Sequence, residues 1–140
     1  MRLFVLDASA WIRLFLRDGP VVAGLEAAAR EVETGAAAFV APEMILVEAA
    51  NALARKVRRR HLRDAERRVL WQEMRRVPID LLPVAGFVEP AMDLAVQRDL
   101  TVHDALYLAV AMHAGAVLFS ADDALAAAAR AEGLTSADRP

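Results

Sequence analysis

Two hydrophobic patterns alternate along this chain. Short apolar runs, such as "LFVL" near the amino terminus, are followed by longer stretches in which apolar residues recur every three or four positions. The short runs are typical of buried strands, and the longer spacing is typical of helices with one apolar face. The pattern predicts strands at 2–6, 37–41, 79–84 and 116–120, and helices at 8–17, 21–33, 43–57, 62–77, 87–98, 101–111 and 122–132.

Proline and glycine mark several of the predicted helix ends. Pro20 and Pro42 precede predicted helices, whereas Gly35 and Pro78 follow them, and these are positions that the two residue types favour. Short strands that alternate with helices through short connections predict an α/β fold. We expect a three-layer sandwich in which helices flank a mainly parallel central sheet of four to five short strands. With 140 residues, the chain is expected to form a single domain, 1–140.

Composition excludes several other classes of protein. Apolar residues make up 57% of the chain and charged residues 26%, which excludes a disordered protein. There is no cysteine, so a disulfide framework and a thiolate metal site are excluded. An acid interrupts the amino-terminal "MRLFVLDASAW", and the apolar run 105–119 is shorter than the ~20 residues that a membrane helix needs. We therefore expect no signal peptide and no membrane segment, and a cytoplasmic location fits.

The helix predicted at 101–111 contains an acid on its apolar side. Asp104 shares a helical column with Tyr107, Leu108 and Ala111, so it points toward the predicted core. A buried carboxylate without a partner costs several kcal/mol, roughly 1 to 5, and usually shifts its pKa. One explanation is a position in the first helical turn after Thr101 as N-cap, where the helix dipole favours an acid. The other is a functional role.

Glu48 presents the same problem in the helix predicted at 43–57. Its column contains Met44, Ile45 and Ala52, so an acid again interrupts an apolar face. Asn51 follows three residues later and could orient the Glu48 carboxylate as a supporting partner.

Two further acids are predicted at strand ends. Asp7 closes the first strand, and Asp122 comes two residues after the last one. Ligands collect at the carboxyl ends of the strands in such sheets, so adjacent strands would bring both carboxylates near one ion, with Ser9 and Ser120 nearby. Helix capping is the alternative for each acid, with Ser120 as N-cap and Asp123 three residues later in a box-like arrangement.

A divalent cation would relieve the repulsion among these four acids. Without such an ion, inward carboxylates raise one another's pKa values and destabilise the fold. The candidate ligands are all oxygen atoms, and there is no histidine pair at metal-binding spacing, so Mg²⁺ or Mn²⁺ is favoured over zinc. Such an ion commonly serves phosphoryl chemistry, which indicates a nuclease.

Positive charge is concentrated in one segment. Residues 55–76 contain ten basic and three acidic residues, a net charge of +7, whereas the remaining seven basic and sixteen acidic residues give −9. Basic blocks of this kind often contact phosphate or an acidic partner, and a solvated helix face is the alternative.

Four motifs then indicate a family. "FVLDASAWI", "PEMILVEAANAL", "LTVHDALYLAVA" and "LFSADDALAAAA" occur in this order over nearly the whole chain. In this respect the chain resembles PIN-domain endoribonucleases, in particular the VapC toxin of a VapBC-type toxin–antitoxin pair. The resemblance implies that Asp7, Asp104 and Asp122 hold one or two Mg²⁺ or Mn²⁺ ions, and that Glu48 is a ligand or a base that positions water. It also implies supporting roles for the polar side chains of Ser9, Asn51 and Ser120, where Ser120 stands in place of the family's usual threonine.

The resemblance also implies a reaction and partners. RNA would be hydrolysed by a metal-activated water, leaving a 3′-hydroxyl and a 5′-phosphate. A cognate antitoxin and RNA would compete for a clip formed by the third and fourth helices, where Arg55, Arg59 and Arg60 are candidate contacts, and the protein would form a homodimer. A partner's basic side chain would enter the acidic pocket and displace the metal.

Other functions stay open at this point. A PIN nuclease in RNA processing and a PIN fold without catalysis both retain the same motifs. A receiver-type signalling domain also gathers acids around Mg²⁺, but it needs an acidic pair at the first strand and a lysine after a late strand. Here Asp7 stands alone, and Lys56 is the only lysine.

Overall fold

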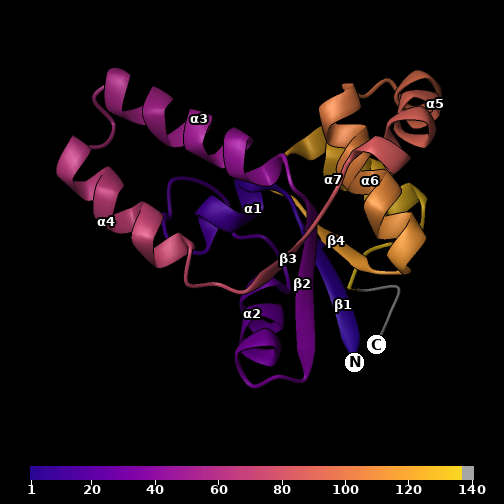
Figure 1. Cartoon of the computed structure of the whole chain (residues 1–140), viewed down its shortest axis with the longest axis horizontal. Helices are drawn as coiled ribbons and strands as arrows, with labels where there is room; N and C mark the ends of the chain where they lie inside the picture. The colour runs from indigo at the N-terminus through magenta and orange to yellow at the C-terminus, as the bar shows by residue number, and fades with distance from the viewer. Residues whose placement is uncertain (137–140) are drawn as a thin grey trace.

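The computed structural model describes residues 1–136 and contains one parallel sheet (Figure 1). Its strands are β1 (Arg2–Leu6), β2 (Ala37–Pro42), β3 (Ile79–Leu82) and β4 (Val117–Phe119), in the order β3-β2-β1-β4. Every neighbouring pair is parallel, and Val5 of β1 lies between Val40 of β2 and Leu118 of β4. The central position of β1 explains why its apolar run is nearly continuous, because both of its faces are covered.

Helices flank this sheet and complete the predicted three-layer α/β sandwich. They are α1 (Ala8–Arg13), α2 (Leu25–Glu33), α3 (Ile45–Arg58), α4 (Asp64–Met74), α5 (Val88–Arg98), α6 (Val102–Ala114) and α7 (Asp123–Ala131), with a 3₁₀ turn, η1 (Ala85–Phe87), before α5. In Figure 1, α3 and α4 extend together away from the sheet, on the opposite side of the molecule from α5, α6 and α7. None of the helices in residues 1–136 is long and apolar enough to cross a membrane.

The core lies where α6 packs on the sheet. All residues from Ala105 to Ala111 of α6 are buried, which is why this helix is apolar around most of its circumference. Within the sheet, the ring of Phe4 contacts those of Phe39 and Phe119, with centroids 6.3 Å and 5.6 Å apart. A rigid sheet-and-helix core therefore supports the carboxyl ends of β1 and β4.

The loop between α1 and α2 is longer than the sequence pattern indicated. The predicted helix 8–17 ends at Arg13, and the helix predicted at 21–33 starts only at Leu25, after Gly24 in a left-handed conformation (φ 81°). The prediction was wrong because the intervening residues make tertiary contacts. The Arg13 guanidinium donates to the carbonyl oxygen of Pro20, and Asp18 pairs with Lys56 of α3.

Candidate active site at the strand ends

Four acids line one cavity at the carboxyl ends of β1 and β4. The backbone N–H of Asp7 donates to the carbonyl oxygen of Phe119 (3.1 Å), so the ends of the two strands meet. The cavity has a volume of about 380 Å³, within the range of ~300–1,000 Å³ typical of ligand pockets. The four predicted acids all line it: Asp7, Glu48, Asp104 and Asp122.

Asp7 is the buried anchor of this cavity. Only 5% of the residue is exposed, and its Oδ1 accepts hydrogen bonds from the Ser9 hydroxyl (2.6 Å) and the Ala10 N–H (2.8 Å). Its Oδ2 accepts from the Ser120 hydroxyl. Burial raises the pKa of Asp7 although these three donors lower it, and the charge of Asp104 adds to the increase. Asp7 thus caps α1, as the helix-capping alternative predicted, and it also lines the cavity.

The two predicted supporting serines join β1 to the segment after β4. The Ser9 hydroxyl oxygen accepts from the Ala121 N–H, and the Ser120 hydroxyl oxygen accepts from the Asp122 N–H, both at 3.0 Å. The N-cap of α7 is Asp122, whose Oδ2 accepts from the Leu125 N–H (2.9 Å), so in the helix-capping alternative the cap is Asp122 and not Ser120. Because each serine also donates to Asp7, these hydroxyls fix the Asp7 carboxylate relative to Asp122.

Asp104 and Asp122 each lie at a helix start. Asp104 is half-buried in the first turn of α6, and its N–H donates to Oγ1 of the N-cap Thr101 (3.1 Å). Burial raises the pKa of Asp104, and the negative charge of Asp122 raises it further. The neighbouring Asp123 lines a different cavity. Of the two adjacent acids, Asp122 is therefore the one that faces the site.

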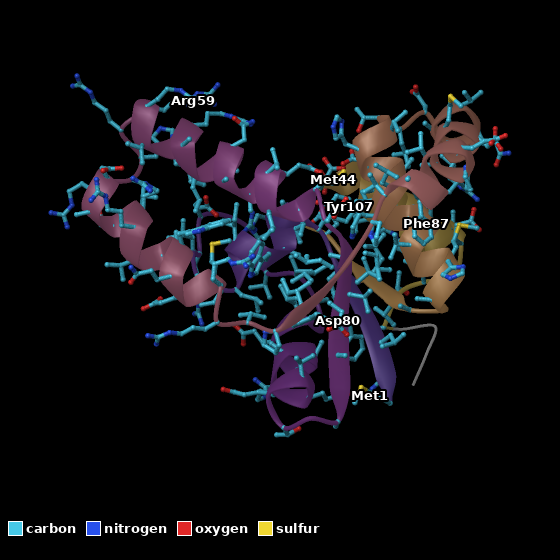
Figure 2. The ribbon with its side chains drawn as sticks, in the orientation of Figure 1. Met1, Met44, Arg59, Asp80, Phe87 and Tyr107 are labelled. Atoms are coloured by element: carbon cyan, nitrogen blue, oxygen red, sulfur yellow. The ribbon has the colours of Figure 1, made fainter. Side chains whose placement is uncertain are left out.

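Glu48 has a partner that the sequence pattern did not indicate. The Tyr107 hydroxyl donates to Glu48 Oε1 (3.1 Å), where α3 meets α6 (Figure 2). Burial raises the pKa of Glu48 despite this donor, and burial and nearby carboxylates raise the pKa of Tyr107, which keeps its proton. The predicted partner, Asn51, is exposed and does not line the cavity; Ala52 lines it instead. A residue three positions after Glu48 is rotated toward solvent here. The only signal for Tyr107 was its shared column with Asp104.

Basic side chains form the other wall of the cavity. Arg55 and Arg59 of α3 line it, as expected, whereas Arg60 does not. Arg60 follows the end of α3 with a positive φ of 59°, which turns it away from the helix direction, and Arg59 lies at the outer end of α3 (Figure 2). The sequence pattern missed four further ionisable residues that line the cavity: Arg13, Asp18, Lys56 and His61. None of the ion pairs found in residues 1–136 involves the four acids.

The ligand atoms that these acids offer are of the kind that a hard divalent cation prefers. All donors are carboxylate or hydroxyl oxygens, as Mg²⁺ and Mn²⁺ prefer, and burial and mutual repulsion raise the pKa values of three of the carboxyls. Within residues 1–136, however, no three His, Cys, Asp or Glu side chains are arranged closely enough to hold a metal. The expected cluster is therefore not preformed. Glu48 accepts a hydrogen bond from Tyr107, and Asp122 accepts one from the Leu125 N–H at the start of α7.

A family comparison agrees with this arrangement of fold and acids. The family model described as "PIN domain" matches residues 4–131, which is most of the chain. The chain belongs to the PIN domain family. The PIN domain is a nuclease fold, and its members are commonly metal-dependent ribonucleases.

One solved structure supports the same assignment of fold. The crystal structure of PAE2754 from Pyrobaculum aerophilum is similar to this PIN domain at 27% sequence identity, with a TM-score of 0.65. The match covers 90% of this chain and 85% of that one. No curated protein matches the chain.

Proposed function

We propose that this PIN domain is a metal-dependent endoribonuclease that hydrolyses RNA phosphodiesters, with Mg²⁺ or Mn²⁺ as its cofactor. The observation that carries the proposal is the cavity itself. It joins four carboxylates of a nuclease fold, three of them with raised pKa values, to a basic wall suited to an RNA backbone. Such a site combines metal ligands with phosphate-binding groups.

The residues take distinct roles in this reaction. Asp7, Asp104 and Asp122 would hold the metal, and Asp7 is the fixed member because three hydrogen bonds orient it. When bound, the ion supplies a water of lowered pKa and stabilises the departing oxygen. Glu48 then accepts a proton from the attacking water or joins the ligands, and the Tyr107 hydroxyl orients Glu48 through Oε1. Cleavage leaves a 3′-hydroxyl and a 5′-phosphate.

Cleavage of end-labelled total RNA tests the proposal. The purified protein is incubated with Mg²⁺, with Mn²⁺ or with chelator, beside the variant Asp104→Asn. Asp123→Asn is a matched control, because it removes an adjacent acid that lines another cavity. Discrete cuts that require the ion and Asp104, but not Asp123, support a metal-dependent nuclease. RNA binding without cleavage under every metal condition would instead assign a catalytically silent binding module.

We further propose that the protein is the toxin of a type II toxin–antitoxin pair that acts on cytoplasmic RNA. The motif order and the acidic pocket support this, because a cognate antitoxin could inhibit the site by inserting a basic side chain among the carboxylates. Induced expression should stop growth, and co-expression of the adjacent gene product should restore it, whereas Asp104→Asn should be harmless. Growth unaffected by the active protein would favour a role in RNA processing.

A further inference from the structure

An internal ion pair occupies the basic wall of the cavity. The Asp18 carboxylate lies between two cations that come from different helices: its Oδ1 is 3.4 Å from Nε of Arg13, and its Oδ2 contacts Nζ of Lys56. Lys56, through its hydrogen bond and charge, lowers the pKa of Asp18. All three residues line the same cavity as the four catalytic candidates. The Asp18 carboxylate therefore already lies between the side chains of Arg13 and Lys56.

The loop after α1 brings Asp18 to this place. The Arg13 guanidinium donates to the carbonyl oxygen of Pro20, which closes the loop around Asp18. Gly19 lies against this guanidinium, because a Cβ at this position would be 2.9 Å from Nη1 and Nη2 of Arg13. The contact between Arg13 and Asp18 is an ion pair without a hydrogen bond, since the buried Nε of Arg13 has no hydrogen-bond partner among residues 1–136.

We propose that Asp18 occupies a subsite for an RNA backbone phosphate, and that a phosphate of the bound strand displaces it from between Arg13 and Lys56. This inference rests on the proposed ribonuclease function and specifies how its substrate is held. A phosphodiester carries the same charge as the Asp18 carboxylate and also presents several oxygens, so it can satisfy both cations. Because Asp18 is partly exposed, its ion pairs are weak and can be exchanged.

The opposite wall favours RNA over an acidic protein segment. A strand that presents one phosphate to a metal held by the acids places neighbouring phosphates along the same cavity, where Arg55 and Arg59 extend the basic wall beyond Lys56. An acidic peptide carries no scissile phosphate, so it would not use the acidic residues and the basic wall of the cavity together. The subsite is thus assigned to the RNA backbone, and a stronger response to an acidic peptide would overturn that assignment.

Binding without cleavage tests the subsite. Affinity of the full chain for a fluorescein-labelled oligouridylate is measured by anisotropy in chelator over a range of salt concentrations. The variants are Asp18→Asn, Lys56→Gln and the double substitution. Glu89→Gln and Arg30→Gln are matched controls, because each makes the same charge change at an exposed position outside the cavity. Oligoglutamate is the competing probe.

The subsite predicts opposite effects of the two single variants. Asp18→Asn should tighten RNA binding by about threefold to fivefold, the scale of one exposed ion pair. Lys56→Gln should weaken binding and reduce the slope of log K against log[salt] by about 0.7, one phosphate contact of a single strand. In the Lys56→Gln background, Asp18→Asn should have a smaller effect than in the wild type, because Asp18 then competes with phosphate only for Arg13.

Failure of the subsite can be separated from failure of the nuclease. In one outcome, the wild type cleaves RNA in a Mg²⁺-dependent way, but substitution of Lys56 or Asp18 changes RNA affinity no more than the control substitutions do. This outcome would overturn the subsite and leave the nuclease proposal standing. Weaker binding by Asp18→Asn would likewise overturn it, because Asp18 would then support the loop or contact RNA itself. In another outcome, RNA binding depends on Lys56 but no RNA is cleaved under any metal condition. This outcome would overturn the proposal of nuclease activity and support the subsite. Displacement of RNA by oligoglutamate at lower concentration than by unlabelled oligouridylate would assign the cavity to a protein segment and overturn the subsite.

Discussion

The hydrogen bond between Tyr107 and Glu48 can be tested by removing a single oxygen atom. Tyr107 is fully buried, and its hydroxyl is the only group in residues 1–136 found to donate a hydrogen bond to the half-buried Glu48 carboxylate. Tyr107→Phe keeps the ring that packs in the core and removes the donor. The Glu48 carboxylate then loses this partner, so its pKa should rise above its already elevated value.

The cost follows from the charge and burial of the acceptor. A hydrogen bond to a charged group contributes roughly 1.5–3 kcal/mol to the free energy of unfolding. Because Glu48 is only half-buried, water can replace part of this bond, and a loss of about 1–2 kcal/mol is expected. For a domain of this size, each kcal/mol shifts the unfolding temperature by about 3–4 °C, so the variant should melt about 3–8 °C lower.

Thermal unfolding followed by circular dichroism measures this loss. The measurement is made above and below the pKa of Glu48, because the penalty should shrink once the carboxyl is protonated. A double-mutant cycle with Glu48→Gln isolates the part of this interaction that depends on the charge of Glu48, because Gln keeps an acceptor oxygen. An unchanged unfolding temperature at neutral pH, or the full loss in the Glu48→Gln background, would show that the hydroxyl does not stabilise the charged form of Glu48. In the nuclease assay, the acidic limb of the pH–rate profile should move to higher pH.

Three further outcomes are expected. Burial raises the pKa of Asp7 above its value in the unfolded chain, so the folded state binds more protons and stability is lost as pH rises from the ordinary pKa of 3.8. Asp7→Asn removes this titration and should therefore flatten the pH dependence of the free energy of unfolding of the metal-free protein in urea titrations; an unchanged pH dependence would contradict this. Mg²⁺ should raise the unfolding temperature of the wild type in a concentration-dependent way but have much less effect on Asp104→Asn, and equal shifts would remove Asp104 from the metal site. The homodimer stays a prediction, and the exposed apolar stripe Val88, Met92 and Val96 on α5 is a candidate surface for it. Val96→Glu should then lower the sedimenting mass, and an unchanged mass would exclude this face.

Local pattern was sufficient for most of the fold. All four strands and the parallel sheet agree with the prediction, because apolar runs and helical spacing reflect burial directly. The pattern failed in the loop between α1 and α2. The residues after Arg13 have helical spacing, but the loop makes tertiary contacts and does not continue the helix. The contacts of Asp18 with Lys56 of α3 and of Arg13 with Pro20 decide the conformation of this loop. Neither contact can be predicted from the hydrophobic spacing of neighbouring residues.

The sequence by itself identified the four acids that line the candidate site, because acids at two strand ends and on two apolar helix faces stand out from the hydrophobic pattern. Only the tertiary structure decided how these acids are held. The Tyr107 hydroxyl reaches Glu48 across 59 positions and the Ser120 hydroxyl reaches Asp7 across 113, so no spacing rule predicts either contact. The same holds for Asn51, which faces solvent, and for the basic wall, where Arg13 and Lys56 converge on Asp18. Periodicity specifies which face of an element is buried, but packing between elements specifies which polar atoms meet there.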